Sequence, residues 1–178
     1  VQRMTDAIIH RGPDGEGHWV NGPIGLGHRR LSIIDLSSAA RQPMTTPDGR
    51  YVLSYNGEVY NFQELRAELQ AQGHRFNSRS DSEVVLRAFA EWGRSALERL
   101  NGMFAFALWD PQDKRLTLAR DRYGIKPLYY ARIGPGAKLR AIPSPRRSHI
   151  SGLEADYGVW GRCGLSEKAS ETETLIRE

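Results

Sequence analysis

The sequence predicts a layered α+β domain, and the order of its secondary-structure signals is the reason. Short strand-like segments come first, two helical segments follow, and three more strand-like segments come after the helices. Strands and helices that are segregated along the chain favour helices packed on antiparallel sheets. Hydrophobic residues make up 39% of the chain and 18 residues are glycine, which is a globular composition with many turns.

Two hairpins are predicted in the first third of the chain. Residues 17–20 and 24–30 are strand candidates joined by a turn at Asn21-Gly22. Further on, Asn56-Gly57 stands between two more strand candidates, and an Asn-Gly pair in that setting is a strong signal for a two-residue hairpin turn. The residues alone therefore predict a turn at this pair.

Two helices are predicted in the middle of the chain. Asn61 is expected to cap a helix that stops at Gly73. Ser80 and Glu83 form a capping box for a second helix, which carries apolar residues on one face and ends at Gly93.

The strand-like segments after the helices are residues 103–109, 115–120 and 128–133. The first of them alternates phenylalanine with alanine, as expected for a buried strand. We expect one domain over residues 1–141, and a poorly ordered tail over residues 142–178 that shows neither strand alternation nor a helical face.

Composition excludes several classes of function. A chain of 178 residues with a net charge of +4 has no strong basic patch, so a nucleic-acid partner is not expected. No apolar segment approaches a membrane span and no signal peptide is visible, so we expect no membrane partner and a cytoplasmic protein. The single cysteine, Cys163, excludes a disulfide framework, and the histidines show no metal-site spacing.

Seven segments resemble one family in order and in spacing. They are HRGPDGEG (10–17), GHRRLSIIDL (27–36), QPM (42–44), YNGEVYNF (55–62), SDSE (80–83), NGMFAFALWD (101–110) and ARDRYGIKPLYY (119–130). The chain resembles the N-terminal class II glutamine amidotransferase domain of the glutamine-hydrolysing asparagine synthetases. That resemblance implies an N-terminal-nucleophile hydrolase fold, a four-layer αββα sandwich, whose first strand has no counterpart here.

The resemblance also implies a set of residues that bind L-glutamine. Asn56 and Gly57 would form an oxyanion hole, from the Asn56 side-chain amide and the Gly57 N–H, and Glu58 would help to hold the amino end. Arg30 would bind the α-carboxylate, because a guanidinium donates two parallel hydrogen bonds to a carboxylate. The backbone of Leu31, Ser32, Ile33 and Ile34 would line the pocket, and Asp81 would bind the α-ammonium group.

Plainer interpretations also exist for Arg30, for Asp81 and for Asn56-Gly57. Arg30 fits a strand end that faces water. Asp81 fits an acid in the first turn of a helix, where the helix dipole stabilises it; we favour both roles for Asp81. Asn56-Gly57 fits an ordinary hairpin turn. The family motifs favour the binding interpretation in each case.

The family's nucleophile is an N-terminal cysteine whose own α-amino group acts as the base. The chain begins at Val1, and Cys163 lies in the tail outside the family motifs. We therefore expect the chain as written not to hydrolyse glutamine.

The rest of the family's machinery is a C-terminal synthetase domain, which activates aspartate with ATP and magnesium. No phosphate-binding loop of that kind is found here, so no cofactor is expected in this domain and the synthetase domain is its implied partner. The resemblance also allows a homodimer of the full-length protein. A frameshift near Ala141–Ile142 is a hypothesis for the unmatched tail.

Two other functions stay open from the sequence. One is the glutaminase domain of a different class II amidotransferase. The other is a non-catalytic module that binds glutamine or a partner subunit. A separate possibility, without a function, is a gene remnant that does not fold.

Overall fold

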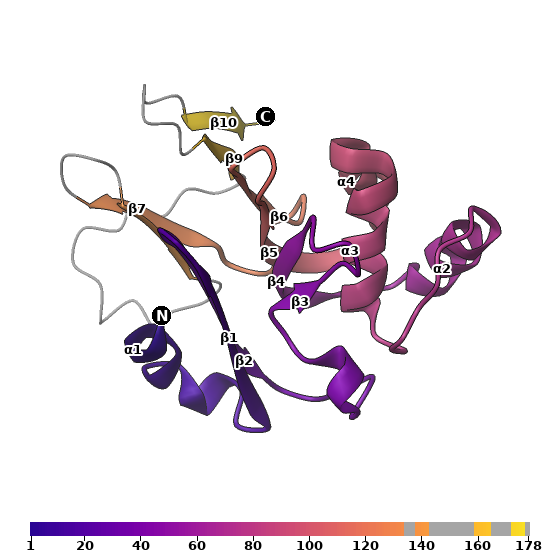
Figure 1. The fold of residues 1–178 in the computed structure, drawn as a ribbon, viewed down its shortest axis with the longest axis horizontal. Coiled ribbons are helices and arrows are strands. Elements are labelled where there is room, and N and C mark those ends of the chain that lie inside the picture. The colour runs from indigo at the N-terminus through magenta and orange to yellow at the C-terminus, as the bar shows by residue number, and fades with distance from the viewer. Residues whose placement is uncertain (134–137, 143–158, 165–171, 177–178) are drawn as a thin grey trace.

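A six-stranded antiparallel sheet with helices on one face is the centre of the structure, which is a computed structural model describing residues 1–133, 138–142, 159–164 and 172–176 (Figure 1). The strand order in the sheet is β10-β9-β6-β5-β4-β3. The strands are β3 (Met44–Thr45), β4 (Val52–Val59), β5 (Gly102–Asp110), β6 (Arg115–Arg120), β9 (Val159–Gly164) and β10 (Thr172–Ile176). The segment expected to be a poorly ordered tail thus contains two strands, and its remaining residues after 142 lie outside the described ranges.

Two smaller sheets and seven helical segments complete the described structure. The hairpins are β1 (Gly15–Asn21) with β2 (Ile24–Arg30), and β7 (Tyr129–Ile133) with β8 (Lys138–Ile142). The α-helices are α1 (Gln2–Asp6), α2 (Phe62–Ala71), α3 (Asp81–Trp92) and α4 (Ala96–Arg99), and the 3-10 turns are η1 (Ile9–Arg11), η2 (Ser38–Ala40) and η3 (Gly93–Ser95).

Strand β5 is buried on both faces and separates two hydrophobic cores. Phe104, Phe106 and Leu108 point to the face covered by α2, α3 and α4. Ala105 and Trp109 point to the other face, which the β1–β2 hairpin covers. Successive side chains of a strand point to opposite faces, so one alternating sequence fills both cores. The prediction of a buried strand here is confirmed.

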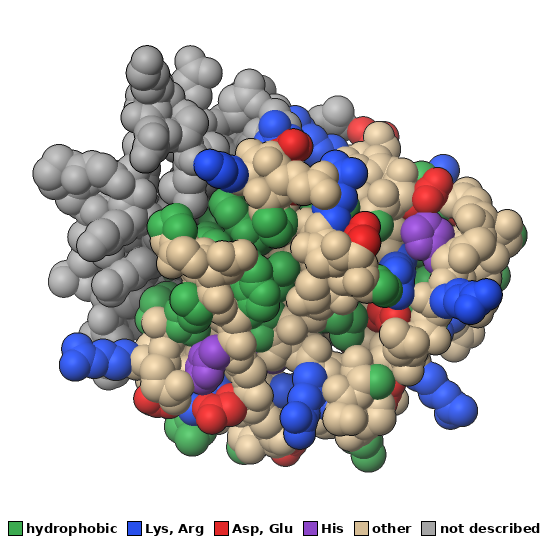
Figure 2. Space-filling view, in the orientation of Figure 1, with side chains coloured by type: hydrophobic (Ala, Val, Ile, Leu, Met, Phe, Trp, Pro, Cys, Tyr) green, Lys and Arg blue, Asp and Glu red, His purple; other side chains and the backbone are tan. Residues whose placement is uncertain are grey.

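The layers follow the order helices, large sheet, small sheets, helix (Figure 1). Helix α1 lies on the outer side of the β1–β2 hairpin, where Gly25 and Gly27 leave room for the side chain of Val1. Hydrophobic side chains are visible between the hairpin and the large sheet in Figure 2. This is the αββα arrangement that the family resemblance implied.

Both helices begin and end where the sequence predicts, but only one has the predicted cap. The hydroxyl of Ser80 accepts from the Glu83 N–H at 3.3 Å, and Gly93 ends that helix with φ +55°. Asn61 makes no capping bond. Its side chain instead binds the backbone of Arg99 and Asn101, at 2.9 Å each, and so joins α2 to the start of β5.

The two predicted turns have different outcomes. The β1–β2 hairpin is confirmed, with the turn one residue later, because Asn21 pairs with Ile24 and Gly22 takes the positive φ of +56°. The prediction of a turn at Asn56-Gly57 is wrong. Both residues lie inside the continuous strand β4, opposite Ala105 and Phe104.

We expect Phe106→Ala to lower the free energy of unfolding by about 3–5 kcal/mol. The Phe106 side chain is 0% exposed and meets the Phe89 ring edge-to-face, with centroids 5.3 Å apart. Urea unfolding followed by circular dichroism measures the change. Tyr123→Ala is the matched control, because that side chain is 88% exposed and its loss is worth at most about 0.5 kcal/mol. Equal urea midpoints of unfolding for the two variants would contradict this description of the core.

Candidate functional site

The edge of β4 that faces away from β5 is only partly covered. Strand β3 pairs with it at Val52 and Leu53 and no further. Beyond that point two side chains take over: Gln42 Oε1 accepts from the Tyr55 N–H at 2.6 Å, and Asp81 Oδ2 accepts from the Val59 N–H at 3.0 Å. The edge is thus closed by side chains at residues 55 and 59.

Between these two positions the N–H of Gly57 is open. Backbone N–H groups two residues apart in a strand point to the same edge, so the Gly57 N–H points the same way as those of Tyr55 and Val59. None of the side chains that the structure describes accepts from it. The neighbouring Asn56 side chain is half-buried and points to the β2 side of the sheet, because it alternates with Tyr55.

Residue 57 must be a glycine because the neighbouring strand β5 approaches it closely, and not because of a turn. Its φ is not positive, whereas a type I′ turn needs positive φ at both central residues. A Cβ built on it would lie 2.5 Å from the Met103 carbonyl oxygen and 2.7 Å from the Phe104 Cα. The tight packing against β5 therefore explains both the glycine and the failure of the turn prediction.

Asp81 is the first residue of α3, and its carboxylate is held against β4. The Tyr55 hydroxyl donates to Asp81 Oδ2 at 2.7 Å, in addition to the Val59 N–H, and Asp81 is only 5% exposed. Burial, and next the charge of Asp81, raise the pKa of Tyr55 well above its usual value, so this hydroxyl remains a donor. No residue in the described part of the chain donates to Asp81 Oδ1; both bonds are to Oδ2.

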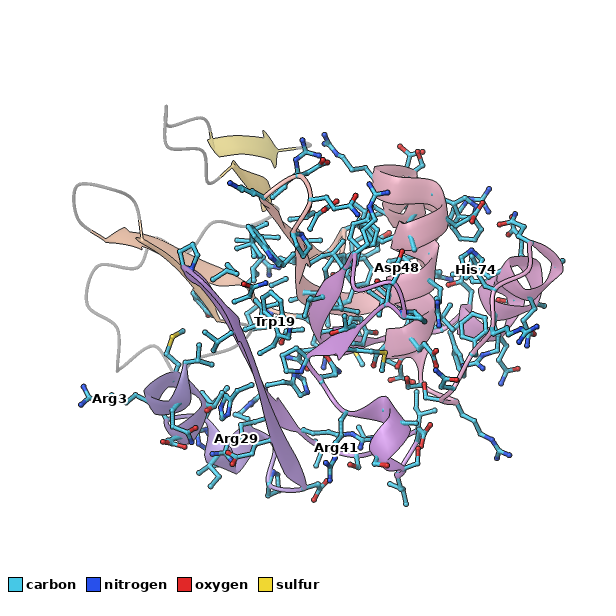
Figure 3. The ribbon with its side chains drawn as sticks, in the orientation of Figure 1. Arg3, Trp19, Arg29, Arg41, Asp48 and His74 are labelled. Carbon is cyan, nitrogen blue, oxygen red and sulfur yellow. The ribbon has the colours of Figure 1, made fainter. Side chains whose placement is uncertain are left out.

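Arg30 ends β2 and turns toward the loop that follows it. Its guanidinium donates to the carbonyl oxygens of Asp35 and Ser37, the latter at 2.9 Å. A guanidinium has five N–H donors, so three remain. Arg29 points the other way, to Asp6 at 2.9 Å and Glu16 at 2.7 Å, near α1 (Figure 3).

The loop of residues 31–37 is anchored at both ends while its apolar side chains stay in solvent. The Ser32 N–H donates to Asp14 at 2.8 Å, and Asp35 Oδ2 accepts from the Arg79 N–H at 2.7 Å, two residues before Asp81. A side-chain hydrogen bond from Ser37, then backbone bonds from Arg79 and Ser37, lower the pKa of Asp35 to about 2. Leu31, Ile33 and Ile34 are exposed.

Glu83 fixes the segment that carries Arg79. Its buried carboxylate accepts from the N–H groups of Asn77 and Ser78 and from the Ser78 hydroxyl, at 2.7–3.1 Å. The sequence assigned Glu83 to a capping box, but its side chain holds the preceding segment instead. The polar contacts thus connect Arg30, the 31–37 loop, the start of α3 and the edge of β4.

Comparisons with known proteins identify the family of the chain. A family model described as a glutamine amidotransferase domain matches residues 1–142. The chain belongs to this family. Asparagine synthetase [glutamine-hydrolyzing] 3 of Bacillus subtilis is 43% identical over 148 residues, covering 80% of this chain and 24% of the relative. A putative asparagine synthetase of Mycobacterium tuberculosis is 43% identical over 194 residues, covering 99% of this chain and 29% of the relative.

These relatives confirm that this is a glutamine amidotransferase domain of the asparagine synthetase type. The chain spans about a quarter of their length. Solved structures show the fold. The glutamine phosphoribosylpyrophosphate amidotransferase of Bacillus subtilis gives a TM-score of 0.59 at 20% identity, covering 84% of this chain and 34% of that one. A glutamine aminotransferase class-II domain protein from Silicibacter pomeroyi gives 0.54 at 16% identity, covering 91% of each chain.

The described residues show neither a cluster of metal ligands nor a membrane-spanning helix. Among the described residues, no group of three or more His, Cys, Asp or Glu side chains is placed to hold a metal ion. His74 pairs with Glu91 at 2.8 Å, and His18 with the Thr5 hydroxyl at 2.8 Å. None of the helices within the described ranges has the length and apolar character needed to cross a membrane.

The pKa of His28 tests whether the charge of Arg30 lies close to this ring. Burial, and next the charge of Arg30, lower the pKa of His28 to about 4. We expect NMR titration to give a midpoint near 4, and Arg30→Gln to raise it while burial keeps it below 6.5. Arg29→Gln is the matched control and should leave the midpoint unchanged.

The same shift has a consequence for stability. Above pH 6.5, His28 is neutral in the folded and unfolded states and has no effect. Between pH 6.5 and about 4 the unfolded chain binds a proton that the folded chain does not. The free energy of unfolding therefore decreases as the pH is lowered through this range. A His28 midpoint at the ordinary value of about 6.5 would contradict the burial of this ring beside Arg30.

Proposed function

We propose that this domain binds L-glutamine at the open edge of β4 and polarises its side-chain amide for nitrogen transfer. The observation that supports this most strongly is the open Gly57 N–H between two hydrogen-bonded neighbours, beside the Asp81 carboxylate. A backbone N–H that a strand leaves unpaired is a suitable donor to a carbonyl oxygen that gains negative charge. The Asn56 side-chain amide would supply the second donor.

The amino-acid end of glutamine needs a cation and an anion. Arg30 has three remaining donors for the α-carboxylate, and Asp81 Oδ1 and the exposed Glu58 face the α-ammonium group in this proposal. The backbone of residues 31–34 would line the space between them. Anchoring of this loop by Asp14 and Asp35 supports such a role, because a site held on fixed elements loses little entropy on binding.

The described groups bind the amide and stabilise charge, and a separate nucleophile must attack the amide carbon. Residues 1–133 contain no cysteine. In the full reaction proposed here, released ammonia reaches aspartate activated by ATP and magnesium in a synthetase domain, the amidotransferase domain's partner. A cytoplasmic location and a homodimer are part of the same proposal. No contact described here favours the binding-module alternative over it.

Arg30→Met should weaken L-glutamine binding to the chain about 10- to 100-fold in isothermal titration calorimetry, because a charge-assisted hydrogen-bond pair is lost. Arg29→Met is the matched control: it removes the same charge from the adjacent position, whose side chain points toward Asp6 and Glu16. Its affinity should stay within about twofold of wild type. Equal losses in the two variants would contradict the assignment of Arg30.

Asp81→Asn should remove the recognition of the ammonium group and leave the rest of the site in place. The asparagine oxygen still accepts from Tyr55 and Val59, so the fold is retained. Wild type should bind L-glutamine more tightly than glutaramate, which lacks the amine, and the variant should reduce that preference about tenfold. An unchanged preference would show that Asp81 has only a structural role.

A further inference from the structure

Gln42 is buried, at 8% exposure, and its side chain joins two elements of the proposed site. Its Oε1 accepts from the Tyr55 N–H at 2.6 Å, next to Asn56 in β4. Its Nε2 donates to the Ser82 hydroxyl at 3.4 Å, next to Asp81 in α3. Gln42 therefore hydrogen-bonds to the chain neighbours of two proposed glutamine-binding residues, Asn56 and Asp81.

The register of the sheet explains why a side chain is needed at this place. Met44 pairs with Leu53, so a longer β3 would put the backbone of residue 42 opposite Tyr55. The strand begins only at Met44, and the Gln42 amide supplies the acceptor that the missing backbone pair would have given. Its backbone is fixed from the other side, where the Gln42 carbonyl oxygen occupies the space that a side chain at residue 17 would need, which makes Gly17 necessary.

We propose that Gln42 is a positioning residue that determines recognition of the ligand's side-chain amide. By holding the Tyr55 N–H it removes a second donor that would compete with the Gly57 N–H for the same carbonyl oxygen. The Gly57 N–H is then the one donor of this edge that remains for the ligand, since Asp81 holds the Val59 N–H. This inference rests on the proposed function.

The test compares L-glutamine with L-norvaline, which has the same three side-chain carbons but lacks the amide oxygen and nitrogen. The ratio of their dissociation constants reports the amide contact alone. Gln42→Met keeps the length of the side chain and removes the acceptor. We expect it to lower the preference for glutamine about five- to tenfold, with norvaline affinity nearly unchanged.

Two further variants separate positioning from general packing. Gln42→Glu keeps an oxygen for the Tyr55 N–H, and the Ser82 hydroxyl can donate to its second oxygen, so it should restore the wild-type preference. Ser82→Ala keeps the bond between Gln42 and Tyr55 and should also leave the preference unchanged. Equal weakening of both ligands in Gln42→Met, or no change in their ratio, would overturn the inference.

Amide hydrogen exchange of the unliganded chain gives a readout that does not depend on binding. In Gln42→Met, the Tyr55 amide should exchange faster, while the Val59 amide stays protected by Asp81. If wild type binds neither ligand, the proposed function fails while this exchange result still tests Gln42. Unchanged exchange at Tyr55, or a loss of protection throughout β4, would overturn the role of Gln42 by itself.

Discussion

The short pairing between β3 and β4 is the constraint on which the rest of the site depends. A full-length partner strand would have hydrogen-bonded every N–H that points to this edge and left no donor for a ligand. Because β3 covers only Val52 and Leu53, the edge beyond them is closed by two side chains, from Gln42 and Asp81. The Gly57 N–H between them stays open, in the middle of a rigid sheet.

The sheet and its helices fix the positions of the groups at this edge. Strand β4 is held between β5 and the two cores, and α3 brings Asp81 to the strand's open edge from the helical layer. Glu83 holds the segment before α3, and Arg79 in that segment holds Asp35. A series of short polar contacts therefore relates the loop after Arg30 to the edge of β4, so glutamine would meet groups that are already in place, which lowers the entropy cost of binding.

The sequence predicted the elements whose signals are local. The Ser80 cap, the glycines that end both long helices and the alternation in β5 all depend on neighbouring residues, and the structure has each of them. The collinear motifs indicated the family, and two of the residues that the resemblance implied, Gly57 and Asp81, lie at β4.

What local signals could not predict depends on contacts between distant residues. The preference of Asn56-Gly57 for a turn is overridden by β5, which pairs with both residues and packs against Gly57 from nearly 50 positions away. Asn61 prefers a distant backbone to its own helix for the same reason. The contacts of Gln42, Tyr55 and Asp35 were missed because they are side-chain hydrogen bonds between segments that are separate in the sequence. The QPM motif was the only signal for Gln42.

Amide hydrogen exchange along β4, with and without L-glutamine, tests the central claim most directly. In the unliganded chain the Gly57 amide should exchange much faster than those of Tyr55 and Val59, since only the latter two are hydrogen-bonded at this edge. Saturating glutamine should slow Gly57 and leave its two neighbours as they were. Protection of Gly57 equal to theirs without ligand, or no response of Gly57 to glutamine, would contradict the account.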